Sequence, residues 1–562
     1  MKDKKIWASL HPFFEQGPAL GRKEANRHFL VALIRAEFFE SCHFFLPHPG
    51  ACAQLEKELR GLFPEMWAEG RFVLRLHRDF AEALQQHVYY CLHLSDPFLH
   101  FTDAICLRNA FSSRIFPVTA PTHSLSYVEY GGYFLNHAWA GVTVRDAVVG
   151  TSVCGRQAVS AYYDRLRRAY GLDEKKFRTP SVRCVPLGVE PQLMPSPEEK
   201  DELGRCCRAR YGLGDKIVFL LFARISYQSK MDLLPLLRAC KRAEEAGLRP
   251  EDYCLLIAGW IDEDDNFDQE IARLAANLGI DCRVAPRPDD AARKALYAAA
   301  DIFLSPADNL QETFGLSILE AALSSLPVVA SNFDGYRDLV DDGENGILAP
   351  VTGPEETQGT DCLARIVPAA EYHLLLAQQS AVDVKAFGEA MYRLAADKAL
   401  RLKMGRAGRQ RVLAGYTWRH VVNRYLDLWA ELNERPCDLP DNIALRPRDA
   451  VFHPANPSYM DVFGRYYTQR IDDPALQDKK LVWSRAGRAV YSGRDFPVIY
   501  RLTERRISPE KLKKMLFMAR RPITVADLRG HCRNPLPCGA PEDQDFVLLW
   551  ALKHDFLEFF VQ

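Results

Sequence analysis

The sequence predicts an α/β protein with two tandem, doubly wound parallel-sheet domains and a smaller, mostly helical C-terminal domain. Short apolar runs alternate with amphipathic helical stretches twice, once before residue 190 and again after residue 215. Runs that are apolar on both faces are typical of parallel strands covered by helices on both sides. The two blocks are joined by the proline-rich, charged stretch "EPQLMPSPEEKDE" at 190–202, and the alternation is lost after about residue 437.

The first block begins with a helical pattern over residues 24–39. The apolar runs that follow are separated by ten or more residues of helical character, which suits helical crossovers between parallel strands. The predicted strands are 43–47, 71–77, 88–94, 115–121, 146–152 and 182–188.

The second block repeats this plan with amphipathic crossovers at 231–247 and 290–300. Its predicted strands are 217–223, 253–259, 282–286, 301–306 and 327–331. Ligands of such sheets bind beyond the carboxyl ends of the strands. With two sheets in tandem, we expect the binding site in the cleft between the two domains.

Composition narrows the class of protein. The 562 residues are 48% hydrophobic and carry a formal net charge of −1, which gives no general reason to expect a nucleic-acid partner. Fifteen cysteines without paired spacing indicate reduced thiols and a cytoplasmic protein. His531, Cys532 and Cys538 lack the second ligand pair of a zinc site, so no metal is predicted. The N-terminus lacks the apolar core of a secretory signal, and no run reaches the roughly 18–20 apolar residues of a spanning helix, so any membrane contact would be peripheral.

The stretch "QETFGLSILEAALSSLPVVAS" at 311–331 carries two acids, Glu312 and Glu320. It predicts a loop, a helix that begins near Gly315, and a strand. Glu320 projects only about 40° from the apolar face of that helix, where a carboxylate is costly unless something meets it. Glu312 precedes the helix, where backbone N–H groups favour anions. The alternative is that Glu312 only caps the helix and Glu320 lies on a surface rim.

"ETFGLSILE" resembles the E-x7-E signature of the retaining glycosyltransferases of glycosyltransferase family 4, which have the GT-B architecture of two Rossmann-like domains. Four other stretches are similar to the family: "LFARISYQSKMDLL", "SVRCVPLGVE", "AGRQRVLAGYTWRHVVNRYLDLW" and "LPVVASNFDGYRDLVDDGENGILAP". The resemblance covers about residues 10–432. It implies an acceptor-binding domain at 1–211, a nucleotide-sugar donor-binding domain at 212–410 and a closing helix at about 411–436 that packs back on the first domain. Residues 437–562 form the accessory domain.

The resemblance assigns the donor side of the site. Arg224 and Lys230, at the end of the first strand of the second block, would stabilise the departing diphosphate without a metal. They are separated by five residues, whereas many family members have four. Glu312 would face the hydroxyls of the donor sugar, and Glu320 would accept hydrogen bonds from the ribose.

Backbone groups complete this side of the predicted site. The N–H groups of Phe314, Gly315 and Leu316 would hold sugar or diphosphate oxygens, and Val284 would offer backbone to the nucleobase. Because backbone contacts do not reveal the base, the donor is a UDP-, GDP- or ADP-linked sugar. No further cofactor is required.

In the first domain, the resemblance points to a Gly-rich loop with Gly17 and Gly21 beside the donor phosphates, and to His123 near the transferred sugar. An ordinary loop and a structural histidine are the alternatives. The acceptor is open among a glycan, a lipid, a peptide and a small molecule.

The implied reaction retains the anomeric configuration, and none of these motifs supplies an obvious carboxylate nucleophile. One alternative is a nucleic-acid-binding or regulatory protein that uses a transferase-like body as a sugar-nucleotide sensor. Another is a nucleotide-sugar epimerase or phosphorylase of the same fold. The sequence contains neither GxGxxG after a first strand nor GxxxxGK[ST], which disfavours a dehydrogenase or P-loop enzyme.

The C-terminal domain is less readable. Two or three helices are expected after Ile507, and they weakly resemble a winged helix. Residues 501–533 hold ten Lys or Arg and three acids, a local net charge of +7. A solvated face of an interaction domain is preferred over nucleic-acid binding, and a protein or peptide is the partner such a domain would recruit.

Overall fold

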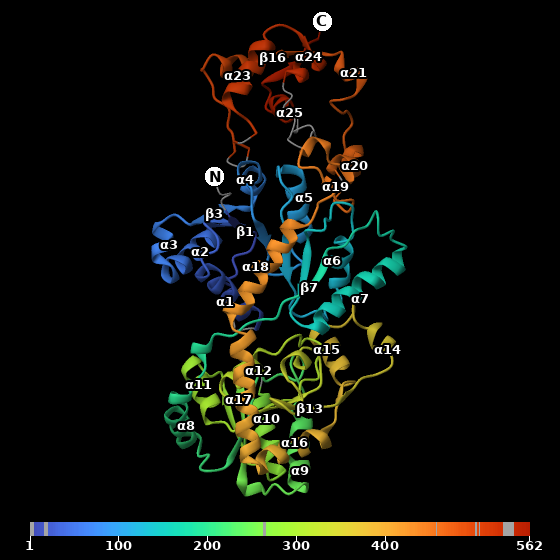
Figure 1. Cartoon of the computed structure of the whole chain (residues 1–562). Helices are drawn as coiled ribbons and strands as arrows, with labels where there is room; N and C mark the ends of the chain where they lie inside the picture. Colours follow the sequence, from blue (N-terminus) through green and yellow to red (C-terminus); the bar gives the residue numbers. More distant parts are fainter. Residues whose placement is uncertain are drawn as a thin grey trace. The chain divides into compact units, whose positions relative to one another are not determined.

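A computed structural model describes residues 5–15, 21–261, 266–456, 458–500, 503–504, 506–531 and 545–561. Contacts divide the chain into two units (Figure 1). Unit 1 comprises Met1–Ile105 and Arg114–Asp438, and unit 2 comprises Cys106–Ser113 and Leu439–Gln562.

The first sheet of unit 1 has seven parallel strands in the order β3-β2-β1-β4-β5-β6-β7. Its predicted strands are confirmed as β2 Ser41–Leu46, β3 Phe72–Leu76, β4 Cys91–His93, β5 Val118–Pro121, β6 Ala147–Gly150 and β7 Ser181–Cys184. The central strand β1, Ile6–Ser9, was not predicted, because four residues are too few to show a period. The helices are α1 Gly21–Arg35, α2 Pro49–Leu62, α3 Pro64–Ala68, α4 Phe80–Gln86, α5 Phe101–Phe111, α6 Tyr130–Asn136 and α7 Val153–Tyr170.

The second sheet has six parallel strands in the order β10-β9-β8-β11-β12-β13. Five strands confirm the prediction, and β13 is additional: β8 Ile217–Phe222, β9 Tyr253–Gly259, β10 Cys282–Pro286, β11 Ile302–Ser305, β12 Val328–Ser331 and β13 Gly346–Ala349. The helices around it are α8 Pro197–Tyr211, α9 Leu234–Glu245, α10 Phe267–Asn277, α11 Asp290–Ala299, α12 Leu316–Leu323, α13 Tyr336–Leu339, α16 Val384–Ala396 and α17 Lys398–Gly415.

An excursion leaves the second domain between two short antiparallel strands, β14 (Val351–Thr352) and β15 (Ala381–Val382). The intervening residues 353–380, called the excursion from here on, contain α14 (Gln358–Asp361) and α15 (Ala369–Ala377). Nothing in the sequence pattern predicted this segment.

Helix α18, Trp418–Glu434, follows the second domain in sequence but buries its apolar face in the core of the first. Trp418 and Trp429 are buried there together with Trp7 and Phe29. The indole Nε1 of Trp429 donates a hydrogen bond to Thr119 Oγ1 on β5, at 2.9 Å. This helix therefore ties the two α/β domains into one unit.

Unit 2 has its own core around a three-stranded antiparallel sheet in the order β17-β16-β18. Its elements are α19 Arg448–Val451, α20 Tyr459–Phe463, α21 Pro474–Gln477, β16 Lys480–Trp483, α22 Arg485–Tyr491, α23 Pro509–Met518, β17 Ile523–Thr524, α24 Val525–Gly530, α25 Phe546–Lys553 and β18 Leu557–Phe559. The helices expected after Ile507 are thus present. The central strand β16 precedes them, and the winged-helix resemblance stays a prediction.

Several basic residues of the predicted +7 segment, namely Arg501, Arg505 and Arg533, lie outside the described residues. Arg529 is not free to meet a phosphate backbone, because its guanidinium makes two hydrogen bonds to the Asp545 carboxylate, at 2.6 and 2.9 Å. Among the helices that the structure describes, none combines the length and apolar character needed to cross a bilayer.

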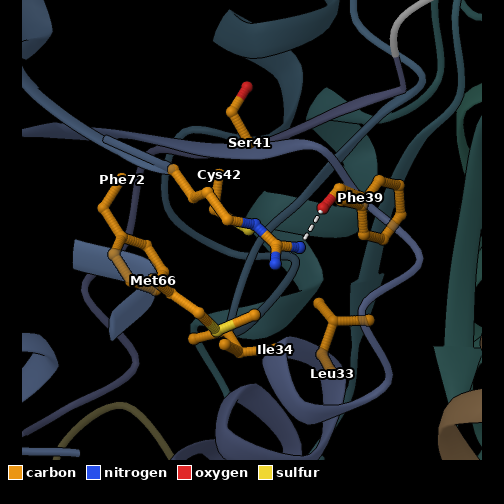
Figure 2. Close-up of a pocket in the computed structure, with 8 residues that line it drawn as sticks. Leu33, Ile34, Phe39, Ser41, Cys42, Met66 and Phe72 are labelled. Atoms are coloured by element: carbon orange, nitrogen blue, oxygen red, sulfur yellow. Dashed lines mark hydrogen bonds between the residues drawn. The ribbon is translucent and has the colours of Figure 1, made fainter. Parts of the chain in front are cut away.

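A small cavity in the first domain is bordered by the side chain of Arg71. It measures about 10 Å³ and lies among residues of α1, β2, α3 and β3 (Figure 2). The Arg71 guanidinium donates a hydrogen bond to the Phe39 carbonyl oxygen across it, at 2.8 Å. A space of this size holds at most about one water molecule. It therefore belongs to the packing of the core.

Candidate active site

The loops that follow β8 and β11 are joined at the carboxyl edge of the second sheet. Asn309 Nδ2 donates a hydrogen bond to the Gln228 carbonyl oxygen at 2.9 Å. The backbone N–H of Asp232 lies 3.3 Å from both carboxylate oxygens of Asp308. These contacts hold the loop that carries Lys230 against the loop that carries Glu312, although the two residues are far apart in sequence.

Lys230 and Glu312 form an ion pair. The same carboxylate oxygen accepts a hydrogen bond from the Tyr336 hydroxyl at 3.1 Å, and its other oxygen lies 3.4 Å from the Phe314 nitrogen. Burial by itself would raise the pKa of Glu312, but the Lys230 ammonium and these hydrogen bonds lower it below its ordinary value. Glu312 is therefore ionised at neutral pH.

Arg224 lies in the same β8 loop as Lys230. Its Nη1 atom donates a hydrogen bond to Ser229 Oγ at 3.1 Å. The structure thus brings Arg224, Lys230 and Glu312 to one edge of the second sheet. Two cations at a strand end are suited to an anionic group of the kind a diphosphate presents.

Glu320 is buried on α12, and protein groups meet its carboxylate. Arg293 forms an ion pair with Oε1, and the Tyr297 hydroxyl donates a hydrogen bond to Oε2 at 2.9 Å. Both partners lie on α11, four residues apart and so on one helix face. Sequence reasoning missed them, although this spacing in "DAARKALYAAA" was a readable signal. Glu320 and Arg293 also line a cavity of about 30 Å³ shared with α1.

The residues predicted to bind the donor through their backbone lie at the start of α12 and in strand β10. Gly315 caps α12, whose first residue is Leu316, and has φ of 108°. A Cβ there would lie 2.6 Å from the Tyr336 ring, so glycine is required by this protein contact in addition to any ligand. Val284 lies in the middle of edge strand β10, paired with Ile257 of β9, two residues before the strand ends.

His123 follows β5 in the first domain. Its Nε2–H donates to the Ser95 carbonyl oxygen at 3.1 Å, which leaves Nδ1 as an acceptor in the neutral ring. Burial, followed by the charge of Arg22, lowers the pKa of His123 to about 4. The next residue, Ser124, donates to the Gln311 carbonyl oxygen at 3.2 Å, which brings the His123 loop against the Glu312 loop.

The Gly-rich loop is only partly described. Gly17 lies outside the described residues. Gly21 is the first residue of α1 and directly precedes Arg22, the residue whose charge acts on His123. The described start of α1 therefore lies close enough to His123 for Arg22 to affect its pKa.

Asp334 is a site residue that sequence reasoning missed. It follows β12 with φ of 42°, a conformation that is uncommon for residues other than glycine and that concentrates at functional sites. Its Oδ1 atom is buried without a hydrogen-bond partner. Burial, and then the charge of Glu312, raises the pKa of Asp334 to about 7. The only sequence signal was an Asp-Gly pair directly after a predicted strand.

No set of three or more His, Cys, Asp or Glu side chains that could hold a metal ion occurs within the described ranges. The charged groups at this edge include the cations Arg224 and Lys230 and the acids Glu312, Asp334 and Asp308.

Comparison with known proteins covers the second domain best. Residues 208–359 match the family described as "Glycosyl transferases group 1". The chain is 29% identical over 239 residues to a D-inositol 3-phosphate glycosyltransferase of Saccharomonospora viridis, which is 41% of this chain and 53% of that protein. It is 38% identical over 104 residues to a phosphatidyl-myo-inositol mannosyltransferase of Mycobacterium tuberculosis, or 18% and 26% of the two chains. The chain thus spans about half the length, or less, of these curated relatives.

Solved structures match about three quarters of the chain. A glycosyltransferase from Rickettsia africae gives a TM-score of 0.52 at 16% identity and covers 78% of this chain and 100% of that one. Anabaena Alr3699/HepE in complex with UDP gives 0.50 at 15% identity and covers 76% and 100%. The two tandem parallel-sheet domains therefore have the GT-B fold, and this prediction is confirmed.

Proposed function

We propose that this chain transfers a sugar from a nucleoside-diphosphate sugar to an acceptor hydroxyl, with retention of anomeric configuration and without a metal. The observation that carries the proposal is the Lys230–Glu312 ion pair, held beside Arg224 where the β8 and β11 loops are joined. The match of residues 208–359 to group 1 glycosyl transferases supports it.

The ion pair keeps both groups in place before substrate binds. When the diphosphate enters, Lys230 can exchange the Glu312 carboxylate for phosphate oxygens, and Arg224 adds its planar fork. Charge grows on those oxygens as the anomeric bond breaks, so the two cations stabilise the transition state more than the ground state. Glu312, released from Lys230, is then free to accept hydrogen bonds from the sugar hydroxyls.

The first domain orients the acceptor hydroxyl. His123 is neutral at physiological pH and bound through Nε2–H, so its Nδ1 faces a hydroxyl as an acceptor. Retention follows from attack on the face from which the diphosphate leaves, with a departing phosphate oxygen taking the acceptor proton. Glu320 serves the ribose once Arg293 yields one of its contacts.

UDP-sugars are the first donors to test, because a solved structure with this fold holds UDP. The decisive experiment is a thermal-shift panel of UDP, GDP, ADP and their hexose conjugates on the wild-type chain and on Glu312→Ala. One nucleotide should raise the Tm of both proteins, since binding to the folded state alone stabilises it. Only the wild type should then release nucleoside diphosphate with an acceptor, in EDTA as well as without it.

The product's anomeric proton, followed by NMR, should keep the configuration of the donor. Inversion, or full activity of Glu312→Ala, would contradict the proposal. A sugar-nucleotide sensor would show the thermal shift without turnover, and an epimerase would change the donor sugar without an acceptor.

A further inference from the structure

A second pocket, of about 260 Å³, lies beside the candidate site within unit 1. One wall is the loop between β5 and α6, residues 127–129, and the other is the excursion, from Ala364 to His373. Neither wall belongs to the donor-binding edge described above. The pocket is therefore distinct from that edge.

The pocket is connected to the candidate site through His373. The ring of His373 is buried and makes two hydrogen bonds, one with the Ser126 carbonyl oxygen at 3.2 Å and one with the Gln311 side-chain amide. It also meets the Tyr127 ring edge-on, at 5.0 Å between centroids. Gln311 directly precedes Glu312, so His373 links the wall of this pocket to the loop of the residue proposed to hold the donor sugar.

The lining of the pocket indicates the chemistry of the occupant. Tyr127 and Tyr372 offer half-buried aromatic rings, and Glu129 and Arg365 stand exposed at the pocket. Neither the Glu129 carboxylate nor the Arg365 guanidinium makes an ion pair or hydrogen bond with another described residue, so both side chains keep their hydrogen-bonding groups for a ligand. A sugar ring fits this lining. Its C–H faces can pack on the tyrosine rings, and its hydroxyls can hydrogen-bond to the carboxylate and the guanidinium.

The size and charge of the pocket further restrict the kind of ligand it can bind. Pockets for drug-sized ligands run from roughly 300 to 1,000 Å³, so a space of this size suits a single ring. The one cation is balanced by one carboxylate, whereas a phosphate group is better held by several cations or N–H donors. A neutral pyranose matches both properties, and a phosphorylated polyol does not.

We propose that this pocket binds a neutral hexopyranose unit of the acceptor, so that the acceptor is a neutral saccharide. The proposal rests on the glycosyl-transfer function proposed above. The excursion determines which acceptors are used, because it supplies Tyr372 and Arg365.

The test is binding of the full-length protein, loaded with the nucleotide identified by thermal shift, to an array of neutral and phosphorylated mono- and oligosaccharides. We expect neutral saccharides to be retained and phosphorylated polyols to be ignored. Arg365→Ala and Tyr372→Ala should weaken saccharide binding about tenfold or more, where tenfold corresponds to 1.4 kcal/mol. Both should leave the nucleotide-induced rise in Tm unchanged.

Tyr170→Ala is the matched control, because Tyr170 is an exposed tyrosine at the end of α7, away from the pocket. It should bind saccharides like the wild type. Glu129→Gln keeps the shape of the pocket but removes a charged acceptor, so it should also weaken saccharide binding if the alanine variants do not fold. Tyr372→Phe keeps the ring and loses only a hydroxyl that is bonded to Asp361, so it should bind like the wild type. Retained binding in Arg365→Ala, Tyr372→Ala and Glu129→Gln, or a preference for phosphorylated ligands, would overturn the pocket assignment. Loss of the nucleotide effect in the wild type would instead overturn the proposed function.

Discussion

Single residues at the candidate site illustrate how a buried charge is tolerated. The Glu312 side chain is 9% exposed and Lys230 is 22% exposed, so each lowers the cost of keeping the other away from water. Glu320 is stabilised in the same way by its ion pair with Arg293. In both cases the acid was visible in the sequence as a pattern, and its partner comes from a segment distant in the chain, the loop after β8 for Glu312 and helix α11 for Glu320.

Removing one member of the Lys230–Glu312 pair should destabilise the fold more than removing both. Breaking a buried pair from one side costs roughly 3–5 kcal/mol, and because Lys230 is partly exposed we expect the lower end of that range for Lys230→Met. The double variant Lys230→Met/Glu312→Gln should recover most of the loss. Urea denaturation of the two single variants and the double variant completes the cycle, and simple additivity would refute the coupling.

Asp334 should make stability depend on pH. Its pKa is raised from 3.8 to about 7, so between these values the folded state binds more protons than the unfolded state. The free energy of unfolding should therefore fall as pH rises from about 4 to about 7, and Asp334→Asn should remove this part of the slope. Denaturant titrations of the wild type and Asp334→Asn across this pH range give the difference between their free energies of unfolding. The contributions of the histidines cancel in this difference. Asp308→Asn provides a comparison, because the pKa of Asp308 is also raised to about 7.

Among the elements, strands β8 and β9 come very close to each other at the end where the candidate site is built. Gly259 ends β9 with φ of 145°, and a Cβ there would lie 1.6 Å from the carbonyl oxygen of Ala223, just after β8. Arg224 is the next residue. Close backbone approach at this point therefore sets the course of the loop that carries both cations.

Gly259→Ala should destabilise the protein far more than Gly171→Ala. Gly171 also has positive φ, at 61°, but a Cβ there meets nothing within 4 Å. Conformational strain of this kind costs about 1–2 kcal/mol, which is what we expect for Gly171→Ala. Gly259→Ala adds a steric clash and should lower the Tm well beyond that, or prevent folding. Similar Tm values for the two variants would show that the chain relaxes around position 259.

In the whole molecule, the boundary between the two units passes through helix α5. Asn109, on that helix, belongs to unit 2 and is fully buried there. Its side-chain amide donates to the Ala450 carbonyl oxygen, and its own carbonyl accepts from Arg446 Nη1, both at 2.7 Å. The contacts of Asn109 with Arg446 and Ala450 therefore lie within unit 2 and join residues 106–113 to the segment after residue 438.

A chain shortened to residues 1–438 should therefore be less stable than one shortened to 1–452. The first loses Arg446 and Ala450, two of the hydrogen-bond partners of Asn109, and the second keeps both. Losing a buried hydrogen bond while its polar group stays away from water costs about 1–3 kcal/mol. Yield of monomer by size-exclusion chromatography and the Tm measure the effect. Equal behaviour of the two shortened chains would mean that these contacts contribute little.

The sequence by itself determined the two α/β domains, because continuous apolar strands with amphipathic crossovers have few other ways to bury their surface. It also determined the residue types at the second sheet's edge: Arg224 and Lys230 follow one strand, and Glu312 follows another. Three features became visible only in the tertiary structure. They are strand β1, the pairing of Glu320 with Arg293 and Tyr297, and the pocket behind Gln311. Strand pairing, ion pairs and pocket walls join residues distant in the chain, and local periodicity carries no record of which distant segments meet.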